Sequence, residues 1–412
     1  MFLVKKENSN PEHIYSFSKE IERRGTSSVK HDMMERDFGR NDLMPMWVAD
    51  MDFPTPEFIL EAIRERCNDS VLGYTYGNRD YYSAVIWWLK RHYKINADKK
   101  ELHYIPGIVA GIAFVIQSFT NEGDKILINT PVYPPFVNLP TNNNRILVKS
   151  PLYIENQRFY IDFDDFREKI KGCKLFIMSN PHNPGGIVWT KEELAQIADI
   201  CHENNCLVIS DEIHADLILN NKKENISFST VSEKAKEISI TFIAPSKSFN
   251  IPGLSSSIAY IPNETIRKKY FDYIDGYELA NGNVFAYLGA TVAYTPDGEL
   301  WLKQLNVAIK KNVMYATKYL KRAMPKVKCI IPEASYLIWL DFSDYGLSHD
   351  EVKDILINKA KVALNDGTDF GGKEYSCCFR INVGCPKLVV RTALIKISTA
   401  FKNITDKTID IE

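Results

Sequence analysis

The sequence predicts an α/β fold, with a large domain in which helices flank a mostly parallel sheet, plus a smaller α+β domain. From about residue 100, short apolar runs alternate with helix-like segments, which is typical of buried parallel strands covered on both faces. After about residue 286 this alternation stops, and a long amphipathic segment precedes shorter strand-like runs. We therefore expect a large domain over 48–286 and a small domain formed by 1–47 and 287–412.

Each element has its own signal in the sequence. Apolar runs bounded by polar or turn residues predict the strands. Residues 190–205 form a helical pattern that opens with Thr190 and carries Glu193 three positions later, which is a capping box. In the small domain, 299–324 reads as a long amphipathic helix and 387–404 as another helix. The predicted strands are 125–130, 174–180, 206–212 and 238–244 in the large domain, and 335–342 and 378–384 in the small one.

Composition and charge argue against several classes of protein. The 412 residues are 45% hydrophobic and 25% charged, which are ordinary globular values. A formal net charge of −1 gives no excess of positive charge that would attract nucleic acid or an anionic membrane. No run approaches the roughly 20 apolar residues of a membrane span, and the N-terminus lacks the apolar run of a signal peptide. We expect a soluble, cytoplasmic protein.

The eight cysteines are scattered and include no CxxC pair. A chain of this size does not need disulfides. Cys201, His202 and Cys206 are close enough in sequence to suggest a metal site, but on a helix they lie beside apolar positions, where packing explains both sulfurs. We therefore predict that these cysteines are structural and that the chain has no metal site.

Polar clusters follow three of the predicted strands. Asn183 lies in "SNPHNPGG", Asp211 in "SDEIHADL" and Lys247 in "PSKSFN". Ligands of open α/β sheets bind beyond the carboxyl ends of the strands, so one shared site is geometrically plausible. A lysine amine, a carboxylate and an amide donor are what a pyridoxal-phosphate site requires. The alternative is that Lys247 is an ordinary surface lysine.

A phosphate site is predicted at the start of the helical segment in 104–119. Pro106 and Gly107 form a turn before an apolar helix, whose first backbone N–H groups would face an anion. The small residues Ala110 and Gly111 would allow the phosphate to approach closely. The same kind of turn also starts many helices that bind nothing.

Several ordered motifs resemble one family along nearly the whole chain. They include "MPMWVADMDFPTP" (44–56), "LGYTYG", "PVYPPF", "NPHNPGG", "SDEIHADL", "PSKSFNIPGL" and "FRINVGCP". Together they resemble the fold-type I pyridoxal-phosphate enzymes of the aminotransferase superfamily, and within them the cystathionine β-lyase-like C–S lyases of the MalY/PatB group. "NPHNPGG" resembles an aminotransferase element, whereas "MWVADMDF" and "DEIHADL" resemble the lyase branch.

The resemblance implies a role for each matching residue. Lys247 would be the Schiff-base lysine and the acid/base that moves the substrate Cα proton. Asp211 would pair with the pyridine nitrogen, and Asn183 with the cofactor phenolic oxygen and the substrate. Tyr133 would stack on the ring as a third catalytic residue, or would only pack within its proline-containing loop. His214 would be a second donor to the phenolic oxygen, or would simply pack against Trp189 or the cofactor ring.

The phosphate would be held by the Val109 and Ala110 amides and the Ser246 hydroxyl. The chain departs from the aminotransferase pattern nearby, with Ser255 where many members have a phosphate-binding arginine and Ala244 where a hydroxyl often lies. The resemblance therefore implies that phosphate affinity rests on backbone amides, Ser246 and a neighbouring subunit's tyrosine.

Arg380 would bind the substrate α-carboxylate through a bidentate pair. Tyr74 would reach the phosphate or substrate of the neighbouring subunit, with Tyr76 as the competing choice. The enzyme would then be a homodimer with shared active sites. The stretch before "FRINVG", at 371–378, is also altered and would affect substrate access.

The function favoured by these motifs is a β-elimination that converts cystathionine or another S-substituted cysteine to a thiol, pyruvate and ammonia. The alternative is an aminotransferase of class I/II, which would use the same lysine, aspartate and arginine. A protein that acts by binding a regulator has little support, because the chain carries no added DNA-binding domain or basic arm.

Overall fold

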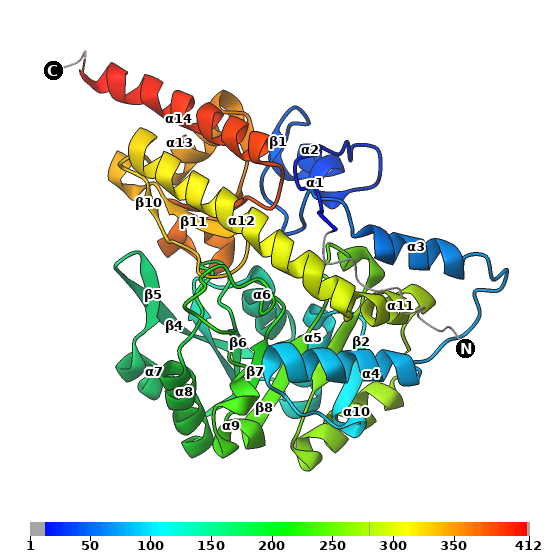
Figure 1. Cartoon of the computed structure of the whole chain (residues 1–412). Helices are drawn as coiled ribbons and strands as arrows, with labels where there is room; N and C mark the ends of the chain where they lie inside the picture. Colours follow the sequence, from blue (N-terminus) through cyan, green and yellow to red (C-terminus); the bar gives the residue numbers. More distant parts are fainter. Residues whose placement is uncertain (1–12, 280, 410–412) are drawn as a thin grey trace.

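The computed structural model describes residues 13–279 and 281–409, arranged as two units that lie one above the other in Figure 1. The lower unit is built on a large sheet. The upper unit combines the N-terminal helices α1 (Val29–Asp32) and α2 (Met34–Phe38) with the C-terminal elements. Residues 1–12, 280 and 410–412 of the predicted domains lie outside the described residues, and the domain boundaries stay a prediction.

The large sheet has eight strands among the described residues, in the order β2-β9-β8-β7-β6-β3-β4-β5. The neighbouring strands β8, β7, β6, β3 and β4 run parallel to one another, whereas β9 and β5 run antiparallel to their neighbours. The prediction of a mostly parallel sheet is confirmed, although the sequence pattern did not identify β2, β4, β5 or β9. The strands are β2 (Leu102–Ile105), β3 (Lys125–Thr130), β4 (Ile146–Glu155), β5 (Arg158–Ile161), β6 (Cys173–Ser179), β7 (Leu207–Asp211), β8 (Ser239–Ile243) and β9 (Ser257–Tyr260).

Helices cover both faces of this sheet. Successive residues of a strand point to opposite faces, so in β3 Ile126 and Ile128 belong to one core and Leu127 to the other. Because both faces are buried, the central strands are apolar along their whole length in the sequence. The first core contains α5 (Ile108–Phe119), α6 (Pro134–Asn142) and α10 (Glu264–Gly276), and the second contains α7 (Phe163–Lys169), α8 (Lys191–Glu203) and α9 (Glu233–Ile238).

The predicted capping box at α8 is confirmed. The Thr190 hydroxyl accepts the Glu193 backbone N–H at 3.1 Å, and the Glu193 carboxylate accepts the Thr190 N–H at 2.7 Å. Each side chain thus satisfies one of the backbone donors that a helix start leaves without a partner.

The upper unit contains an antiparallel sheet in the order β10-β11-β14-β13. Its central strands β11 and β14 correspond to the predicted strands at 335–342 and 378–384. Helix α12 begins at Pro296, before the predicted start at 299, because the Thr295 hydroxyl caps the Gly298 N–H and proline suits a first helical position. The elements are β10 (Lys328–Cys329), β11 (Leu337–Asp341), β13 (Asn365–Asp366), β14 (Cys378–Asn382), α12 (Pro296–Ala323), α13 (His349–Asp354) and α14 (Lys387–Ile409).

The N-terminal segment lies against this upper unit. Strand β1 (Met44–Pro45) pairs in parallel with β12 (Val362–Ala363). The chain then crosses towards the large sheet through residues 47–53 and continues into helices that pack on α11 beside the sheet (Figure 1). These helices are α3 (Glu57–Arg66), α4 (Arg79–Trp88) and α11 (Val284–Ala293).

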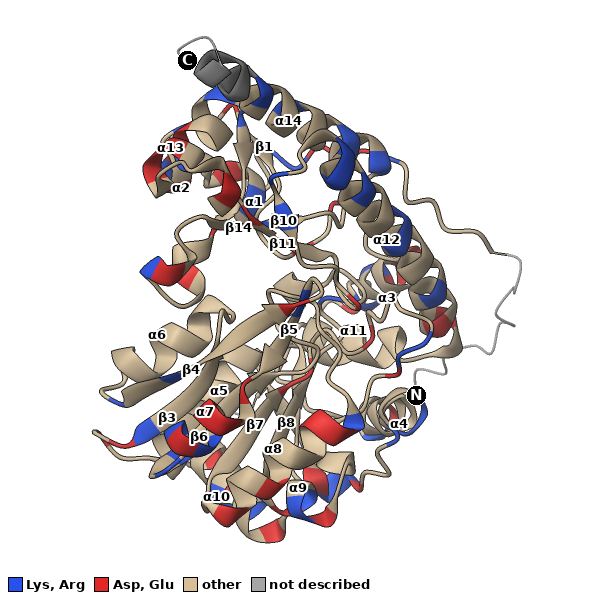
Figure 2. Cartoon of the chain, turned by 90° about the vertical axis from the view of Figure 1, so that its left-hand side faces the viewer, with Lys and Arg blue, Asp and Glu red and all other residues tan. Residues whose placement is uncertain are grey.

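The charged side chains and cysteines form no candidate metal centre in the described part of the chain. Lys and Arg gather along α12 and α14, whereas both signs mix on α8, α9 and α10 (Figure 2). All eight cysteines are free, and Cys201 and Cys206 are buried in the core beside α8. Residues 13–279 and 281–409 hold no group of three or more His, Cys, Asp or Glu that could bind a metal. No helix in these ranges has the length and apolarity needed to cross a membrane.

Candidate active site

The sequence-predicted residues gather at one edge of the large sheet. Strands β2, β3, β6, β7 and β8 point in the same direction, so the loops that follow them emerge at the same edge. These loops carry the predicted residues from five separate parts of the chain: Val109 and Ala110 after β2, Tyr133 after β3, Asn183 after β6, Asp211 and His214 at the end of β7, and Ser246 and Lys247 after β8.

Lys247 lies at this edge of the sheet and is partly exposed. Its Nζ donates to the backbone carbonyl of Ala49 at 2.6 Å. The surrounding protein displaces water that would stabilise an ammonium, and this lowers the pKa of Lys247 to about 8, although Asp50 and Asp211 oppose the change. A lysine that reaches its neutral form near physiological pH can act as a nucleophile and a base.

Asp211 is buried at the end of β7. Its carboxylate accepts the Ile213 backbone N–H at 3.0 Å. Burial raises the pKa of Asp211 to about 7, an effect that the Ile213 N–H and the charge of Lys247 oppose. A carboxylate in this setting is stabilised by a cationic partner in the site.

Arg380 reaches the same edge from β14 of the upper unit. Its Nη1 donates to Asn183 Oδ1 at 3.0 Å and its Nη2 to Asn365 Oδ1 at 2.6 Å. The guanidinium carbon lies 4.9 Å from the centre of the Phe370 ring. Burial lowers the pKa of Arg380 to about 10, yet the group stays cationic at neutral pH. The contact with Asn183 joins the two units at the site.

His214 is buried, and its ring lies 6.3 Å from that of Tyr336, centre to centre. The alternative that His214 packs against Trp189 is wrong, because the histidine beside Trp189 is His182, at 5.6 Å. Burial lowers the pKa of His214 to about 3, an effect that nearby Lys247 and Arg380 reinforce, so the imidazole is neutral. Its Nδ1 has no hydrogen-bond partner among the described residues.

Tyr133 and Ser246 complete the polar lining. Tyr133 precedes the first turn of α6, and burial raises the pKa of its hydroxyl. Asp211 reinforces that shift and Arg380 opposes it, which places both charges near the phenol. Ser246 is buried directly before Lys247.

The start of α5 offers free backbone donors. Gly107 precedes the helix, no side chain caps it, and the first helical bond runs from the Gly111 N–H to the Gly107 carbonyl. The preceding amides, including those of Val109 and Ala110, therefore have no partner within the helix. Gly111 is also required for helix–sheet packing, because a Cβ there would lie 2.5 Å from Ile105 Cδ1, and its role in letting a phosphate approach stays a prediction.

Tyr74 and Tyr76 are not brought to the site within this chain. Both rings are largely exposed on the segment between α3 and α4, in a groove that α11 also lines. Val71 and Leu72 in the same segment are exposed too.

Sequence reasoning missed several residues that contact the predicted ones. Asn365 and Phe370 contact Arg380, and the Tyr336 hydroxyl donates at 2.9 Å to the same Ala49 carbonyl that accepts from Lys247. The motif "MWVADMDF" indicates the lyase branch but not the role of its backbone. Its carbonyls carry no side-chain signal that sequence inspection detects.

Comparison with known proteins identifies the family. The aminotransferase class I and II family matches residues 41–397. The chain belongs to the aminotransferase class I and II family. Within it, the chain is 39% identical over 389 residues to cystathionine β-lyase PatB of Bacillus subtilis (strain 168), covering 93% of this chain and 99% of PatB.

Two solved structures of similar sequence share the fold. Cystalysin from Treponema denticola, which contains a pyridoxal 5'-phosphate cofactor, is 30% identical with a TM-score of 0.91, covering 95% of this chain and all of cystalysin. The PLP-bound C–S lyase from Staphylococcus hominis is 35% identical with a TM-score of 0.87, covering 94% of this chain and 98% of that one. The fold and the resemblance to PatB-type lyases predicted from the motifs are confirmed.

Proposed function

We propose that this chain is a pyridoxal-phosphate-dependent C–S β-lyase that converts cystathionine or another S-substituted cysteine to a thiol, pyruvate and ammonia. The observation that carries the proposal is the convergence of Lys247, Asp211 and Arg380 at one edge of the sheet. The identity to a named cystathionine β-lyase over 99% of that protein favours a lyase over the aminotransferase alternative.

The residues of the site fit pyridoxal phosphate. The buried Asp211 carboxylate suits a protonated ring nitrogen, and the uncapped start of α5 suits a phosphate. Nδ1 of His214 has no hydrogen-bond partner among the described residues and suits the phenolic oxygen. When bound, the cofactor supplies an electron sink at the substrate Cα.

The protein's own groups would then orient the substrate and move one proton. Arg380 binds the α-carboxylate, and Lys247 Nζ takes the proton from Cα. The Cα electron pair forms the Cα–Cβ double bond as the Cβ–S bond breaks, and the sulfur leaves as a thiolate. A thiolate is a good leaving group, so a strong acid at the sulfur is not required. Water hydrolyses the released 2-aminoacrylate to pyruvate and ammonia.

An assay without keto acid separates the two functions. Purified protein with cystathionine should release pyruvate and thiol in equal amounts through many turnovers. A single turnover that resumes when a keto acid is added would instead make the protein an aminotransferase. The assay measures pyruvate, free thiol and the visible absorbance of the bound cofactor together.

Arg380→Lys is expected to raise KM about 100-fold with a smaller loss in kcat, because lysine cannot bind a carboxylate with two parallel bonds. The measurement is steady-state kinetics with cystathionine. Arg158→Lys, in the ion pair of Arg158 with Glu193, serves as a control and should leave KM unchanged. An Arg380→Lys variant with wild-type KM would exclude this carboxylate role.

We further propose that the chain forms a homodimer whose active sites are shared through Tyr74 or Tyr76. The exposed apolar side chains of 71–76 support a partner at this surface. Sedimentation equilibrium should give twice the 47.2 kDa chain mass, and a monomer at micromolar concentration would overturn the proposal. The cytoplasmic location expected from the sequence stays a prediction.

A further inference from the structure

The crossing segment 47–53 is held by side chains along its backbone, although it forms no regular strand or helix. Its carbonyls receive donors from both units, so the segment is fixed from several directions. Such backbone groups need partners when they are enclosed by protein. The Trp47 carbonyl accepts from Arg380 at 3.5 Å, and the Val48 and Asp50 carbonyls accept from Asn382 at 2.6 and 2.7 Å. The Ala49 carbonyl accepts from Lys247 at 2.6 Å and from Tyr336 at 2.9 Å, and the Met51 carbonyl accepts from Asn250 at 3.0 Å.

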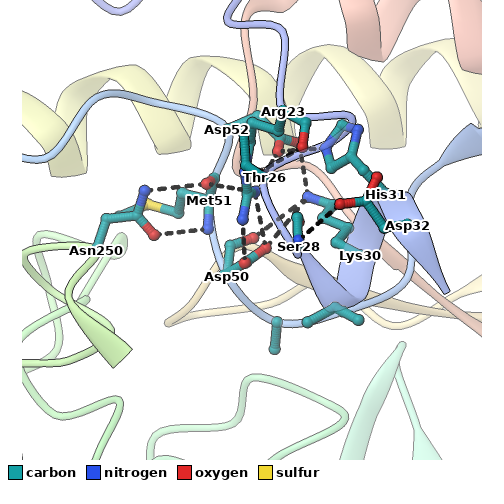
Figure 3. A network of polar contacts seen from close by, with 12 residues as sticks. Arg23, Thr26, Ser28, Lys30, His31, Asp32, Asp50, Met51, Asp52 and Asn250 are labelled. Carbon is teal, nitrogen blue, oxygen red and sulfur yellow. Dashed lines mark hydrogen bonds and ion pairs between the residues drawn. The ribbon is translucent and has the colours of Figure 1, made fainter. Parts of the chain in front are cut away.

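A charged cluster holds the middle of this segment. Arg23 donates to Asp50 at 2.6 Å and to Asp52 at 2.7 Å, and Lys30 donates to Asp52 at 2.6 Å and to the Asp50 carbonyl at 3.3 Å (Figure 3). His31 contacts Asp52 at 3.2 Å. The Lys30 side chain is 1% exposed. Removing one partner of a buried ion pair is strongly destabilising, so the contacts of Lys30 with these carboxylates are needed in the folded protein.

The same segment is tied to the loop that carries Lys247. Asn250, three residues after Lys247, accepts the Met51 N–H and donates to the Met51 carbonyl, both at 3.0 Å (Figure 3). It also donates to the Phe53 carbonyl at 2.8 Å. The Ala49 carbonyl, the charged cluster and the lysine loop therefore form one connected unit.

We propose that Arg23 and Lys30 are positioning residues for Lys247: by holding Asp50 and Asp52, they fix the Ala49 carbonyl as the acceptor for the free Lys247 amine. The inference rests on the proposed function of Lys247 as the base at Cα. A neutral amine that donates one N–H to Ala49 points its lone pair away from that carbonyl. The acceptor thus orients the lone pair that takes the proton, and Arg23 and Lys30 act through it without touching substrate.

The cluster also controls the charge that Lys247 experiences. The charged or titratable groups that face Lys247 from the elements around it include Asp50, Asp211, Arg380 and His214. The Tyr336 hydroxyl, which shares the Ala49 carbonyl with Lys247, is also among them. Asp50 belongs to the cluster, and Arg23 neutralises it. Loss of Arg23 leaves Asp50 less compensated and favours the protonated form of Lys247, whereas loss of the Asp50 charge favours the neutral form.

The test measures how fast cofactor-free protein regains visible absorbance after pyridoxal phosphate is added, as a function of pH. This rate requires a neutral Lys247 amine, so the wild-type midpoint is expected near pH 8. In Arg23→Gln the midpoint should rise by about half a pH unit or more, and in Asp50→Asn it should fall. Pyruvate release by Arg23→Gln should show kcat lowered about ten-fold with KM nearly unchanged.

Controls separate positioning from general destabilisation. Arg23→Lys keeps the charge and should restore most of the shift, and Arg40→Gln, which removes a similar pair with the half-exposed Asp42, should change neither readout. Lys30→Met gives a second, independent variant if Arg23→Gln does not fold. Midpoints that stay at the wild-type value, or that move in the same direction in Arg23→Gln and Asp50→Asn, would overturn the inference. A wild-type protein that releases no pyruvate would instead overturn the proposed function, while the midpoints would still test the positioning role.

Discussion

Lys247→Ala is expected to lower the rate of pyruvate and thiol release by at least about 10³-fold, because the amine that takes the Cα proton is lost. The measurement is the turnover number with cystathionine. Lys247→Arg is the matched control for charge, since it keeps a cation but supplies no neutral amine at working pH. It should be as inactive as Lys247→Ala. Activity within ten-fold of wild type in either variant would contradict the proposed role.

The charge of Lys247 is also expected to affect the stability of the folded protein. Lys247→Met, without cofactor, should unfold at a higher temperature than cofactor-free wild type below pH 8. The folded state lowers the pKa of Lys247 from 10.5 to about 8, so the ammonium destabilises the fold fully below pH 8. The difference should vanish above about pH 10.5, where the lysine is neutral in both the folded and the unfolded chain. Thermal unfolding at several pH values measures it.

Asp211→Asn is expected to lower the turnover number by roughly 10²–10³-fold, because a neutral amide does not stabilise a proton on the ring nitrogen. The visible spectrum of the bound cofactor should change with it. Asp211→Glu keeps the charge with a longer side chain and should retain more activity than the amide. Equal turnover numbers in the two variants would show that catalysis does not depend on the charge of Asp211.

The pH dependence of stability gives Asp211 a separate test. Burial raises its pKa from 3.8 to about 7 in the folded chain. The carboxylate therefore destabilises the folded state fully above pH 7, and the penalty disappears below about pH 3.8. Cofactor-free Asp211→Asn should unfold at a higher temperature than wild type at pH 8 and at the same temperature near pH 3.5. A lower unfolding temperature at pH 8 would contradict this account.

Sequence reasoning located Lys247, Asp211 and Asn183 because each follows an apolar run, and the ends of parallel strands share one edge of a sheet. The same reasoning predicts that Gly111 is small so that a phosphate can approach closely. The structure shows that the side chains of Ile105 and Phe242 leave no room for a Cβ there. A glycine that packs a helix on a sheet and one that admits a ligand look the same in a sequence.

The ion pairs of Arg23 and Lys30 with Asp50 and Asp52 were not predictable. Arg23 and Lys30 lie in a polar stretch, whereas Asp50 and Asp52 lie in the largely apolar "MWVADMDF". Their pairing depends on how the N-terminal segment lies across 47–53. No helical or strand periodicity links residues that lie 22 to 29 positions apart in the sequence.

The sequence by itself determined the central strands, the capped helix α8 and the residue types of the site, because periodicity and local hydrogen bonding are properties of neighbouring residues. The tertiary structure decided which carbonyl Lys247 meets, which charges face it and that Arg380 joins Asn183 across the two units. Those contacts join segments that are distant in the chain. The pKa shifts of the site residues are caused by burial, and these residues become buried when the units pack together.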